Sequence, residues 1–461
     1  MVESKPSVAL KHAFDPDHVA VVGASNRSSN AGLSYVRALR AARFPGRLSV
    51  VNRNAERVLR AAGHKRLGDL PTVPDLAILA VPGERVPEAL EEAAAHGIKA
   101  VHCFSGGFAE RGDPDRIALQ HRVANIAHEH DIALIGPNCM GIYRPSAGLA
   151  FRADQPMLAG NVALVSQSGG VAIAVVHQLA ARGIGISTAV SFGNAAQLRA
   201  GTLASAVAEA HVPGVVGVYV ESANEPDLLE ELARVAKTHR AVLYVGPGTA
   251  SAHAASARHT ATPGGPWRDT DEPTSGVTVV DSLEAFVGAL AWFAADPEPA
   301  PRPTVAFATI SGGIGVLAAT ELGRAGVDLV QTSEETRAEI ESILPGGLVV
   351  GRNPVDLGVS YLSRKVAART LTALRKDPAV ELTIFHMVWD HLVDVDVQSP
   401  GYADGYLELV ASHAADRRDL AVYFPRLVEN ASEREARRRL RNRGVRVFET
   451  FTEVTAALST S

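Results

Sequence analysis

The chain has 461 residues, 46% of them hydrophobic and 21% charged, and a formal net charge of −5. This length allows roughly three domains, and the mildly acidic balance argues against nucleic acid or an anionic membrane as a partner. The two cysteines, Cys103 and Cys139, are too few for a disulfide framework or a CxxC metal site. The first residues lack the apolar core of a signal peptide, and no window holds the roughly 18 apolar residues that span a bilayer. We therefore expect a cytoplasmic protein without a metal site of its own.

Short β-branched runs alternate with Ala- and Leu-rich helical stretches along most of the chain. This alternation is typical of parallel, doubly wound α/β sheets, and the continuous apolar runs indicate strands covered on both faces. The series restarts near residue 155 and again after a proline-rich segment, whose prolines oppose both helix and central strand. We predict three domains and a linker, at residues 1–154, 155–296, 297–303 (the linker) and 304–461.

A glycine turn follows the first strand, from Gly23 to Gly32. Such a turn presents backbone N–H groups and a helix N-terminus to a phosphate, although the GxGxxG pattern is absent. After the second strand the chain has Arg53, where a dinucleotide-binding unit would offer Asp or Glu to a ribose hydroxyl. A basic side chain suits a phosphorylated ribose, as in CoA or NADP. A purely structural turn is the alternative.

Two more glycine turns follow strands of the second series, SQSGG at 166–170 and SFGN at 191–194. Helix N-termini favour anions, so the two turns could hold a phosphate, while parallel sheets need such turns in any case. Cys139 could be a nucleophile, but no base is assigned to it. We expect Cys103 and His102, which lie in an apolar strand, to pack in the core.

Five segments identify a family by resemblance: GASNRSSNAGLSYVRAL, VNRN, DLAILAVP, SGGFAE and GPNCMG. They occur in the order found in ADP-forming acetate–CoA ligases and succinyl-CoA synthetase α chains, and the resemblance covers nearly the whole chain. It implies a Rossmann-like CoA-binding domain followed by two flavodoxin-like parallel-sheet domains. The residues that it implies for the CoA nucleotide, for the adenine or pantetheine path and for the thiol end are Gly23, Ser25, Arg27 and Arg53, then Val81 and Pro82, then Asn138.

The segment SAHAASARHTATPGG, residues 251–265, resembles the mobile phosphohistidine loop of this family. The resemblance implies that His259 carries a phosphoryl group and that Glu221 orients it, with His253 as the nearby alternative. The residues that it implies for phosphate binding are Ser166, Ser168, Gly169, Gly170, Gly193 and Asn194. The chain departs from the family pattern at Gln197, at residues 246–249, and at Arg258 and Ala261.

The implied reaction is the reversible conversion of acyl-CoA, phosphate and ADP into a carboxylic acid, CoA and ATP, through an acyl phosphate and a phosphohistidine. The sequence contains no GxxxxGK[ST] motif and no recognisable ATP-grasp region. We therefore expect ATP or ADP, with Mg²⁺, on a separate ATP-grasp β-type subunit, and a homo-oligomer is also compatible with the sequence. The substrate would be a small carboxylic acid or its acyl-CoA.

Two other functions stay open. A non-catalytic CoA- or acyl-CoA-binding regulatory protein would retain the first glycine turn without phosphorylation of His259. An NADP-dependent oxidoreductase would explain Arg53 but would leave the phosphate turns without a purpose. In the third domain, Asn353–Asp356 resembles a recurrent Asn-Pro-Val-Asp signature of these ligases, which we do not expect to be catalytic. We expect this domain to support the core and an interface with a nucleotide-binding partner. The charged helical segment 433–443 is expected to be solvated.

Overall fold

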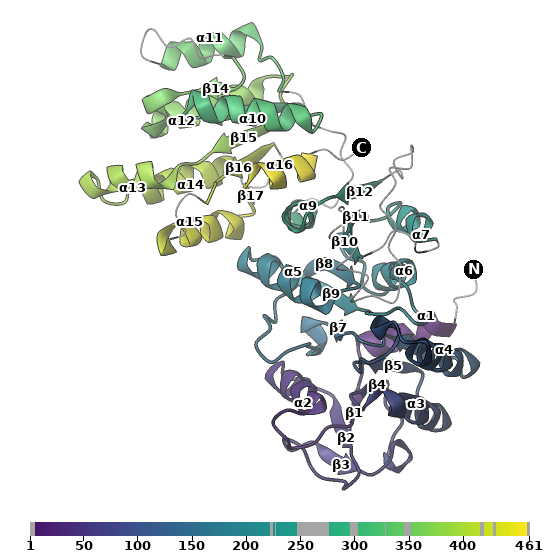
Figure 1. The fold of residues 1–461 in the computed structure, drawn as a ribbon. Helices are drawn as coiled ribbons and strands as arrows, with labels where there is room; N and C mark the ends of the chain where they lie inside the picture. The colour runs from purple at the N-terminus through teal and green to yellow at the C-terminus, as the bar shows by residue number, and fades with distance from the viewer. Residues whose placement is uncertain are drawn as a thin grey trace. The chain divides into compact units, whose positions relative to one another are not determined.

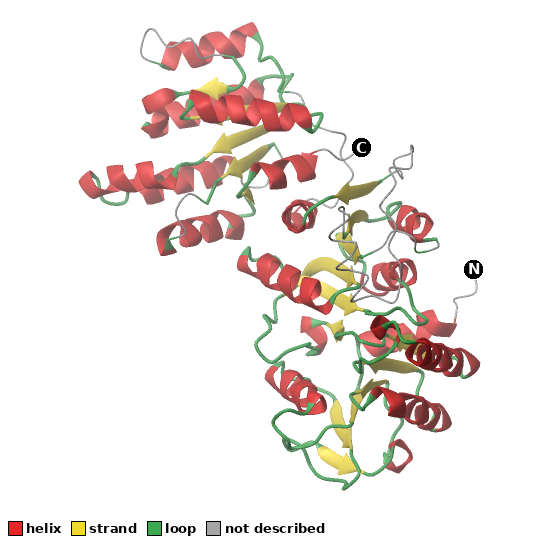
Figure 2. Ribbon diagram, viewed as in Figure 1, coloured by secondary structure: helices red, strands yellow, loops and turns green. Residues whose placement is uncertain are grey.

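The computed structural model describes residues 5–221, 225, 227–246, 276–295, 303–327, 329–344, 352–414, 419–426 and 430–458. These residues form three sheets (Figure 1) with helices packed against them (Figure 2). They divide into two compact units, one before and one after the junction between residues 282 and 283. The first unit contains two sheets and the second unit contains one.

The first sheet has the strand order of a Rossmann fold, and all its strands are parallel. In spatial order its strands are β3 (Ala62–His64), β2 (Arg47–Val51), β1 (His18–Val22), β4 (Leu76–Leu79), β5 (Ala100–Cys103) and β6 (Ala133–Ile135). Its helices are α1 (Lys5–Phe14), α2 (Ala31–Ala41), α3 (Val86–Ala95) and α4 (Pro114–Glu129), with short 3₁₀ turns η1 (Leu67–Asp69), η2 (Gly83–Arg85) and η3 (Ala109–Arg111). The strand order reverses direction between β1 and β4, and in such sheets ligands bind in the crevice beyond that point.

The second sheet has a flavodoxin-like order if β8 is counted as its first strand. In space its strands are β12 (Val277–Val280), β11 (Arg240–Val245), β10 (Val215–Val220), β8 (Ala159–Ser166), β9 (Ile186–Ser191) and β7 (Gly141–Tyr143). Its helices are α5 (Gly169–Ala181), α6 (Ala200–His211) and α7 (Leu228–Val235), and η4 (Pro145–Ala147) follows β7. β7 is antiparallel to β9 and comes from sequence that we assigned to the first domain.

The third sheet repeats the flavodoxin-like order, and its strands are also parallel. They are β14 (Val355–Asp356), β13 (Val305–Thr309), β15 (Leu382–His386), β16 (Leu420–Tyr423) and β17 (Arg446–Phe448). The helices of this unit are α9 (Leu283–Ala295), α10 (Gly312–Arg324), α11 (Glu334–Ile343), α12 (Arg364–Lys376), α13 (Trp389–Gln398), α14 (Tyr402–Ala414), α15 (Ala431–Asn442) and α16 (Phe451–Leu458), with η5 (Gly358–Leu362). The predicted α/β class is thus confirmed. α9 packs closely on α16, since a Cβ on Gly288 would lie 2.7 Å from Cγ of Glu453.

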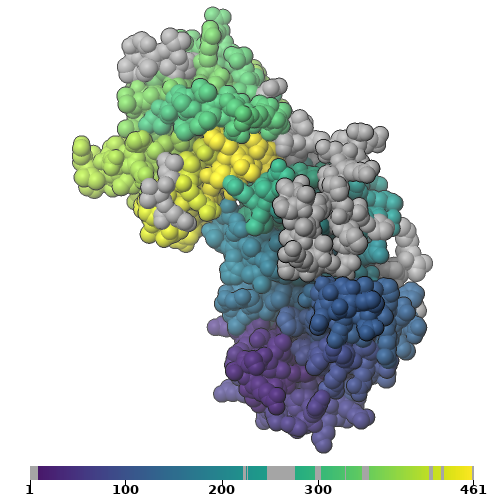
Figure 3. All heavy atoms as spheres, in the orientation of Figure 1, coloured from purple at the N-terminus to yellow at the C-terminus, as the bar shows by residue number. Residues whose placement is uncertain are grey.

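The core of the first unit is continuous between its two sheets. Every residue of β1 and of β10 is buried, as expected for strands with helices on both faces. One apolar cluster includes Val21 of β1, Ile142 of β7 and Val165 of β8. In Figure 3 the purple-to-blue and teal-blue parts of this unit accordingly form an unbroken surface. Among the described residues no helix is long and apolar enough to cross a bilayer.

Candidate functional site

A cleft of about 690 Å³ opens at the carboxyl ends of β1, β2 and β4. It lies at the reversal of strand order, where the Rossmann topology predicts a ligand. Six of the residues that the sequence assigned to CoA line it together: Gly23, Ser25, Arg27, Arg53, Val81 and Pro82. The structure therefore brings these side chains to one cavity, although they come from three separate segments. Asn138, the seventh, does not line the cleft.

The glycine turn has no room for a larger residue at its first position. Gly23 has φ +92°, and a Cβ there would lie 2.4 Å from the carbonyl oxygen of Ala80. Asn30, the N-cap of α2, fixes the turn, since its Oδ1 accepts hydrogen bonds from the amides of Leu33 (2.8 Å) and Ser25 (3.0 Å). Its Nδ2 donates to the carbonyl of Gly23 (3.0 Å). Sequence reasoning missed Asn30, which the preference of helix N-caps for Asn could have identified.

Three cations point to anion binding in this cleft. Arg27, Arg53 and Lys65 are exposed and line it, and within the described part of the chain none of these side chains has a hydrogen-bond or ion-pair partner. Arg85, also on the cleft, lies 3.8 Å from Glu88. Lys65 was missed in the sequence because β3, which it follows, is only three residues long and has no clear strand pattern.

Three turns of the second sheet meet at one edge of that sheet. β8 lies between β9 and β10, and its last residue, Ser166, is level with Ser191 and with Tyr219. The turns that follow these strands leave the sheet side by side, because parallel strands share their carboxyl edge. They contain the residues that the sequence assigned to phosphate and to orienting the histidine: Ser166, Ser168, Gly169, Gly170, Gly193, Asn194 and Glu221.

The turn after β8 builds the N-terminus of α5. Ser166 Oγ donates to the carbonyl of Ser168 (2.7 Å), and Ser168, the N-cap, accepts from the amide of Val171 (3.4 Å). Gly169 and Gly170 are the first helical residues. The amide of Glu221 donates to Gln167 Oε1 (2.8 Å), which holds the end of β10 against this turn. A helix N-terminus stabilises an anion by typically 0.3–1 kcal/mol, so this turn alone would stabilise a phosphate only modestly, and phosphate binding here stays a prediction.

The turn after β9 joins the second sheet to the first. Gly193 has φ +57°, and a Cβ there would lie 2.2 Å from the carbonyl oxygen of Asn138. The buried Asn194 donates through Nδ2 to Glu110 Oε2 (2.6 Å) and Gln120 Oε1 (2.9 Å), and its Oδ1 accepts from Asn138 Nδ2 (3.3 Å). Asn138, which the resemblance gives to the thiol end of CoA, and Asn194, which it gives to phosphate, thus lie together. Both ends of the Asn194 amide are bound by protein groups, and its contact with phosphate stays a prediction.

Glu110 is the carboxylate that organises this junction. Its Oε1 accepts from the amide of Gly107 (2.5 Å), and its Oε2 accepts from the amide of Phe108 (3.1 Å) as well as from Asn194. Glu110 belongs to the SGGFAE segment, but the sequence does not identify it as a site residue because its partner lies 84 positions away along the chain. Gln197, a departure from the family pattern, has a structural partner, since its Oε1 accepts from the amide of Leu134 (2.8 Å).

The cysteines and the strand histidine are core residues. Burial raises the pKa of the Cys103 thiol to about 12 and also raises the pKa of Cys139 well above its usual value. Burial lowers the pKa of His102 to about 4. Its Nε2 lies 3.1 Å from the carbonyl oxygen of Cys139, and a Cβ on Gly141 would lie 2.3 Å from the imidazole ring. These contacts confirm the packing role expected of His102 and Cys103, and they oppose a nucleophilic role for Cys139.

The histidine segment lies outside the described residues, including His253, Arg258, His259 and Ala261. Their roles stay predictions. Among the residues that are described, no group of three or more His, Cys, Asp or Glu side chains could hold a metal ion.

In the second unit, Asn353 of the signature at 353–356 forms hydrogen bonds with the backbone of the sheet and of the segment beside it. Asn353 is buried and donates to the carbonyls of Val305 (2.7 Å) and Val330 (2.8 Å), while its Oδ1 accepts from the amide of Phe307 (2.9 Å). Every polar atom of its side chain is thus used inside the fold. The structure therefore gives Asn353 a role in holding the strands together.

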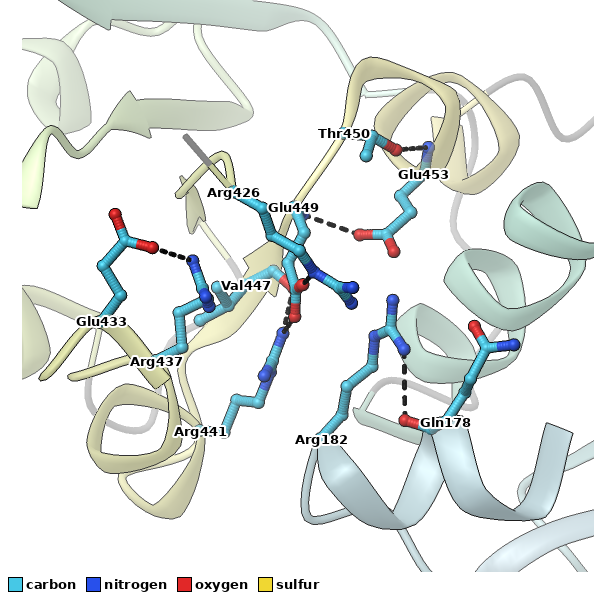
Figure 4. A network of polar contacts seen from close by, with 10 residues as sticks. All are labelled: Gln178, Arg182, Arg426, Glu433, Arg437, Arg441, Val447, Glu449, Thr450 and Glu453. Carbon is cyan, nitrogen blue, oxygen red and sulfur yellow. Dashed lines mark hydrogen bonds and ion pairs between the residues drawn. The ribbon is translucent and has the colours of Figure 1, made fainter. Parts of the chain in front are cut away.

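The charged segment 433–443 is only partly solvated, contrary to our expectation. Glu433 and Arg437 on α15 are each only 2% exposed and lie 3.5 Å apart (Figure 4). The i, i+4 spacing places both on one face of the helix, and the Arg437 guanidinium lies over the Phe424 ring. Glu449 continues the network through Arg426 and through Arg441 (2.6 Å).

Two known domain families match the first unit and the start of the second. Residues 17–145 match the family described as a CoA binding domain, and residues 159–293 match a succinyl-CoA ligase like flavodoxin domain. The ADP-forming acetate–CoA ligase II subunit alpha of Pyrococcus furiosus is 29% identical over 452 residues, which cover 97% of this chain and 96% of that subunit.

Two further similar proteins, a ligase and a solved structure, differ in how much of their own length matches this chain. The ADP-forming 4-hydroxybutyrate–CoA ligase of Nitrosopumilus maritimus is 26% identical over 75% of this chain, and the match covers 50% of that ligase. A structure described as the dinucleotide forming acetyl-coenzyme A synthetase 1 of Ca. Korarchaeum cryptofilum with phosphate and ADP has a TM-score of 0.82 at 23% identity, covering 98% of this chain and 96% of that one. The latter likeness confirms the fold over the whole length.

Proposed function

Because the chain belongs to the nucleotide diphosphate-forming acyl-CoA synthetase superfamily, we propose that it is the CoA-ligating, α-type part of such an enzyme. The observation that carries the proposal is the convergence of six residues, assigned to CoA from sequence, on one cleft of a domain that matches a CoA-binding family. In the same unit, the turns assigned to phosphate meet at one edge of the second sheet.

In the proposed reaction, inorganic phosphate attacks the acyl-CoA thioester, which gives an acyl phosphate and releases the CoA thiol. The phosphoryl group then passes to His259, which frees the carboxylic acid, and from His259 to ADP. Ser168, Gly169 and Gly193 would position the phosphate, and Glu221 would orient the imidazole. Phosphoryl transfer depends chiefly on positioning and on electrostatic stabilisation, which fits a site built from turn amides and a helix N-terminus.

ATP or ADP and Mg²⁺ would be bound by a separate β-type subunit of the ATP-grasp kind. The Pyrococcus relative, which matches this chain from end to end, is named a subunit alpha. The chain spans about half the length of the Nitrosopumilus ligase. The acid is a small carboxylic acid, and the names of the relatives support acetate and 4-hydroxybutyrate as the first candidates.

The test is phosphorylation of the chain from acyl-CoA. The purified chain, His259→Ala and His253→Ala would each be incubated with a panel of acyl-CoAs, inorganic phosphate and Mg²⁺, and intact mass would be measured at neutral pH. We expect one acid-labile phosphate on the parent chain and on His253→Ala, and none on His259→Ala. If a chain that binds CoA remains unphosphorylated with every acyl-CoA, even with its β-type partner present, a non-catalytic CoA-binding protein becomes the better account.

A further inference from the structure

The turn after β8 contains a glutamine whose backbone contacts both neighbouring strand ends. Gln167 follows Ser166, the last residue of β8, and β8 lies between β9 and β10. The amide of Gln167 donates to the carbonyl of Tyr219 on β10 (2.9 Å), and its carbonyl accepts from the amide of Gly193 in the turn after β9 (3.1 Å). One residue therefore holds the backbone of three strand ends together.

The side chain of Gln167 adds a further contact, with Glu221. In a regular parallel ladder, a residue whose amide donates to Tyr219 would accept the amide of Glu221 at its own main-chain carbonyl. The carbonyl of Gln167 instead accepts from Gly193, and its side-chain Oε1 accepts from the amide of Glu221 (2.8 Å). The side chain thus takes the place of a main-chain acceptor and links the turn after β8 to the turn after β10.

The backbone of Glu221 is also confined on its other side, by β11. The amide of Gly246, directly after β11, donates to the carbonyl of Val220 (2.7 Å). A Cβ on Gly246 would lie 2.8 Å from the hydroxyl oxygen of Tyr219 and 3.4 Å from Cα of Glu221. Gln167 and the end of β11 therefore hold this backbone between them and fix the point from which the carboxylate side chain extends.

The proposed transfer step depends on the distance between two of these turns. Ser168 would position the phosphate, and Glu221 would orient the imidazole of His259 from within hydrogen-bond reach, about 2.6–3.2 Å. A misplacement of about 1 Å can slow a reaction on the order of a hundredfold. Gln167 precedes Ser168 in the chain and bonds to Glu221, so it links the two groups directly.

We propose that Gln167 is a positioning residue for phosphoryl transfer, whose side-chain oxygen fixes the turn that carries Glu221 relative to the phosphate turn after β8. This inference rests on the proposed function, in which Glu221 orients the histidine. The phosphate turn has contacts of its own, because Ser166 bonds to Ser168 and Ser168 caps α5. Loss of the Gln167 acceptor should therefore slow the transfer step without weakening the binding of CoA or phosphate.

The test compares two substitutions of Gln167 in the full chain. Gln167→Met keeps the length of the side chain but removes the acceptor, whereas Gln167→Glu keeps an acceptor oxygen. Each protein would be incubated with acetyl-CoA, or with the acyl-CoA that phosphorylates the parent fastest, and with Mg²⁺ over a range of inorganic phosphate concentrations. The β-type partner is added if the parent requires it, and intact mass at neutral pH gives the rate of phosphorylation.

The expected result is a fall in rate without a loss of binding. Gln167→Met should lower the rate at saturating phosphate about 10- to 100-fold, with the half-saturating phosphate concentration and the calorimetric Kd for CoA within about twofold of the parent. Gln167→Glu should recover the rate at saturating phosphate to within about threefold of the parent. Its added negative charge beside the phosphate turn should raise the half-saturating phosphate concentration.

Gln197→Met is the matched control for the loss of a hydrogen bond. Gln197 is half-buried, as Gln167 is, and its Oε1 also accepts from a backbone amide at 2.8 Å, that of Leu134. The two methionine variants should therefore lose similar amounts of unfolding free energy. Only Gln167→Met should be slow, and Gln197→Met should be phosphorylated at the parent's rate.

The outcomes separate this inference from the proposed function. If Gln167→Met matches the parent's rate at saturating phosphate, or if Gln167→Glu is as slow as Gln167→Met, the positioning role is wrong while the proposed function stands. If Gln167→Met does not fold, Gln167→Asn takes its place, because its shorter side chain withdraws the oxygen from Glu221, and the same rates decide. If no acyl-CoA phosphorylates the parent even with its partner present, the proposed function fails and the role of Gln167 fails with it.

Discussion

The cleft of the first sheet and the turns of the second sheet are built in opposite ways. In the cleft, Arg27, Arg53 and Lys65 have no protein partner among the described residues, so a ligand would supply the opposite charges. At the turns, Ser166, Ser168 and Asn194 already have hydrogen-bond partners within the protein. We therefore expect cleft residues to control ligand affinity with little effect on stability, and turn residues to control both stability and the phosphoryl-transfer step.

The largest loss of stability is expected from a substitution in the turn after β9, which joins the second sheet to the first. Gly193→Ala adds a Cβ 2.2 Å from a backbone oxygen at a residue with φ +57°, and we expect it to lower the free energy of unfolding by about 3 kcal/mol or more. Denaturant unfolding measures this loss. Gly97→Ala is the matched control, because Gly97 has φ +85° with nothing within 4 Å of the added Cβ, and it should cost only about 1–2 kcal/mol. Equal losses would show that Gly193 is not constrained by Asn138.

Acid should destabilise the fold through His102, which packs against Cys139 and Gly141. Burial lowers the folded-state pKa of His102 from 6.5 to about 4, so folding favours the neutral ring. Its contribution to stability is therefore fully present above pH 6.5 and is lost as pH falls toward 4, at most about 3 kcal/mol. Unfolding free energies measured from pH 7 to pH 4.5 check this. His102→Gln should make the profile shallower in that range, while His386, whose pKa burial also lowers to about 4, retains part of the slope. An unchanged slope would contradict the assignment.

Substitution of Glu110 should distinguish most clearly between the function of the turns and that of the cleft. Glu110→Gln weakens the bonds from Asn194 and Gly107, and we expect a loss of about 1–2 kcal/mol in unfolding free energy. Phosphorylation of the chain should slow while the affinity for CoA stays within about twofold of the parent, the reverse of the pattern expected for Lys65→Ala.

Glu84→Gln is the control for this change, because Glu84 pairs with Arg116 at the surface. It should leave both stability and phosphorylation unchanged. A Glu110→Gln variant that weakens CoA binding as strongly as Lys65→Ala does would remove the distinction between the two regions.

The smallest effect is expected when the native chain is treated with a thiol reagent, because neither cysteine is expected to act as a nucleophile. Because burial raises the pKa of both thiols, iodoacetamide should label neither Cys103 nor Cys139 in the native chain at pH 8. It should label both after unfolding, as peptide mass spectrometry would show. Rapid labelling of native Cys139 that also blocks phosphorylation would restore the nucleophile hypothesis.

Local patterns were sufficient to predict the main architecture and the cleft. The alternation of apolar runs with helical stretches predicted three parallel sheets, and the glycine turn together with Arg53 located the ligand crevice, because strand-end turns are contiguous in sequence. The resemblance to a family then supplied Val81 and Pro82. These residues come together in one cleft because each belongs to a short segment whose place in a Rossmann sheet is fixed by topology, and their contact with CoA stays a prediction.

Residues that depend on contacts between distant segments could not be predicted. Lys65 lies beside Arg53 only because the three-residue strand β3 pairs with β2, and Glu110 reaches Asn194 across 84 positions. β7 joins the second sheet through three antiparallel residues that carry no strand signal of their own. Arg437 appeared solvated because its neighbours are charged, and its burial becomes visible only when α15 is placed on its sheet.

Calorimetric titration of the full chain with CoA and, separately, with NADPH tests most directly whether the cleft of the first sheet is a CoA site. We predict saturable binding of CoA at one site per chain and no detectable binding of NADPH, with CoA binding lost in Gly23→Ala because its Cβ would lie 2.4 Å from the Ala80 carbonyl oxygen. Saturable binding of NADPH with none of CoA would contradict the assignment and would favour an NADP-dependent oxidoreductase.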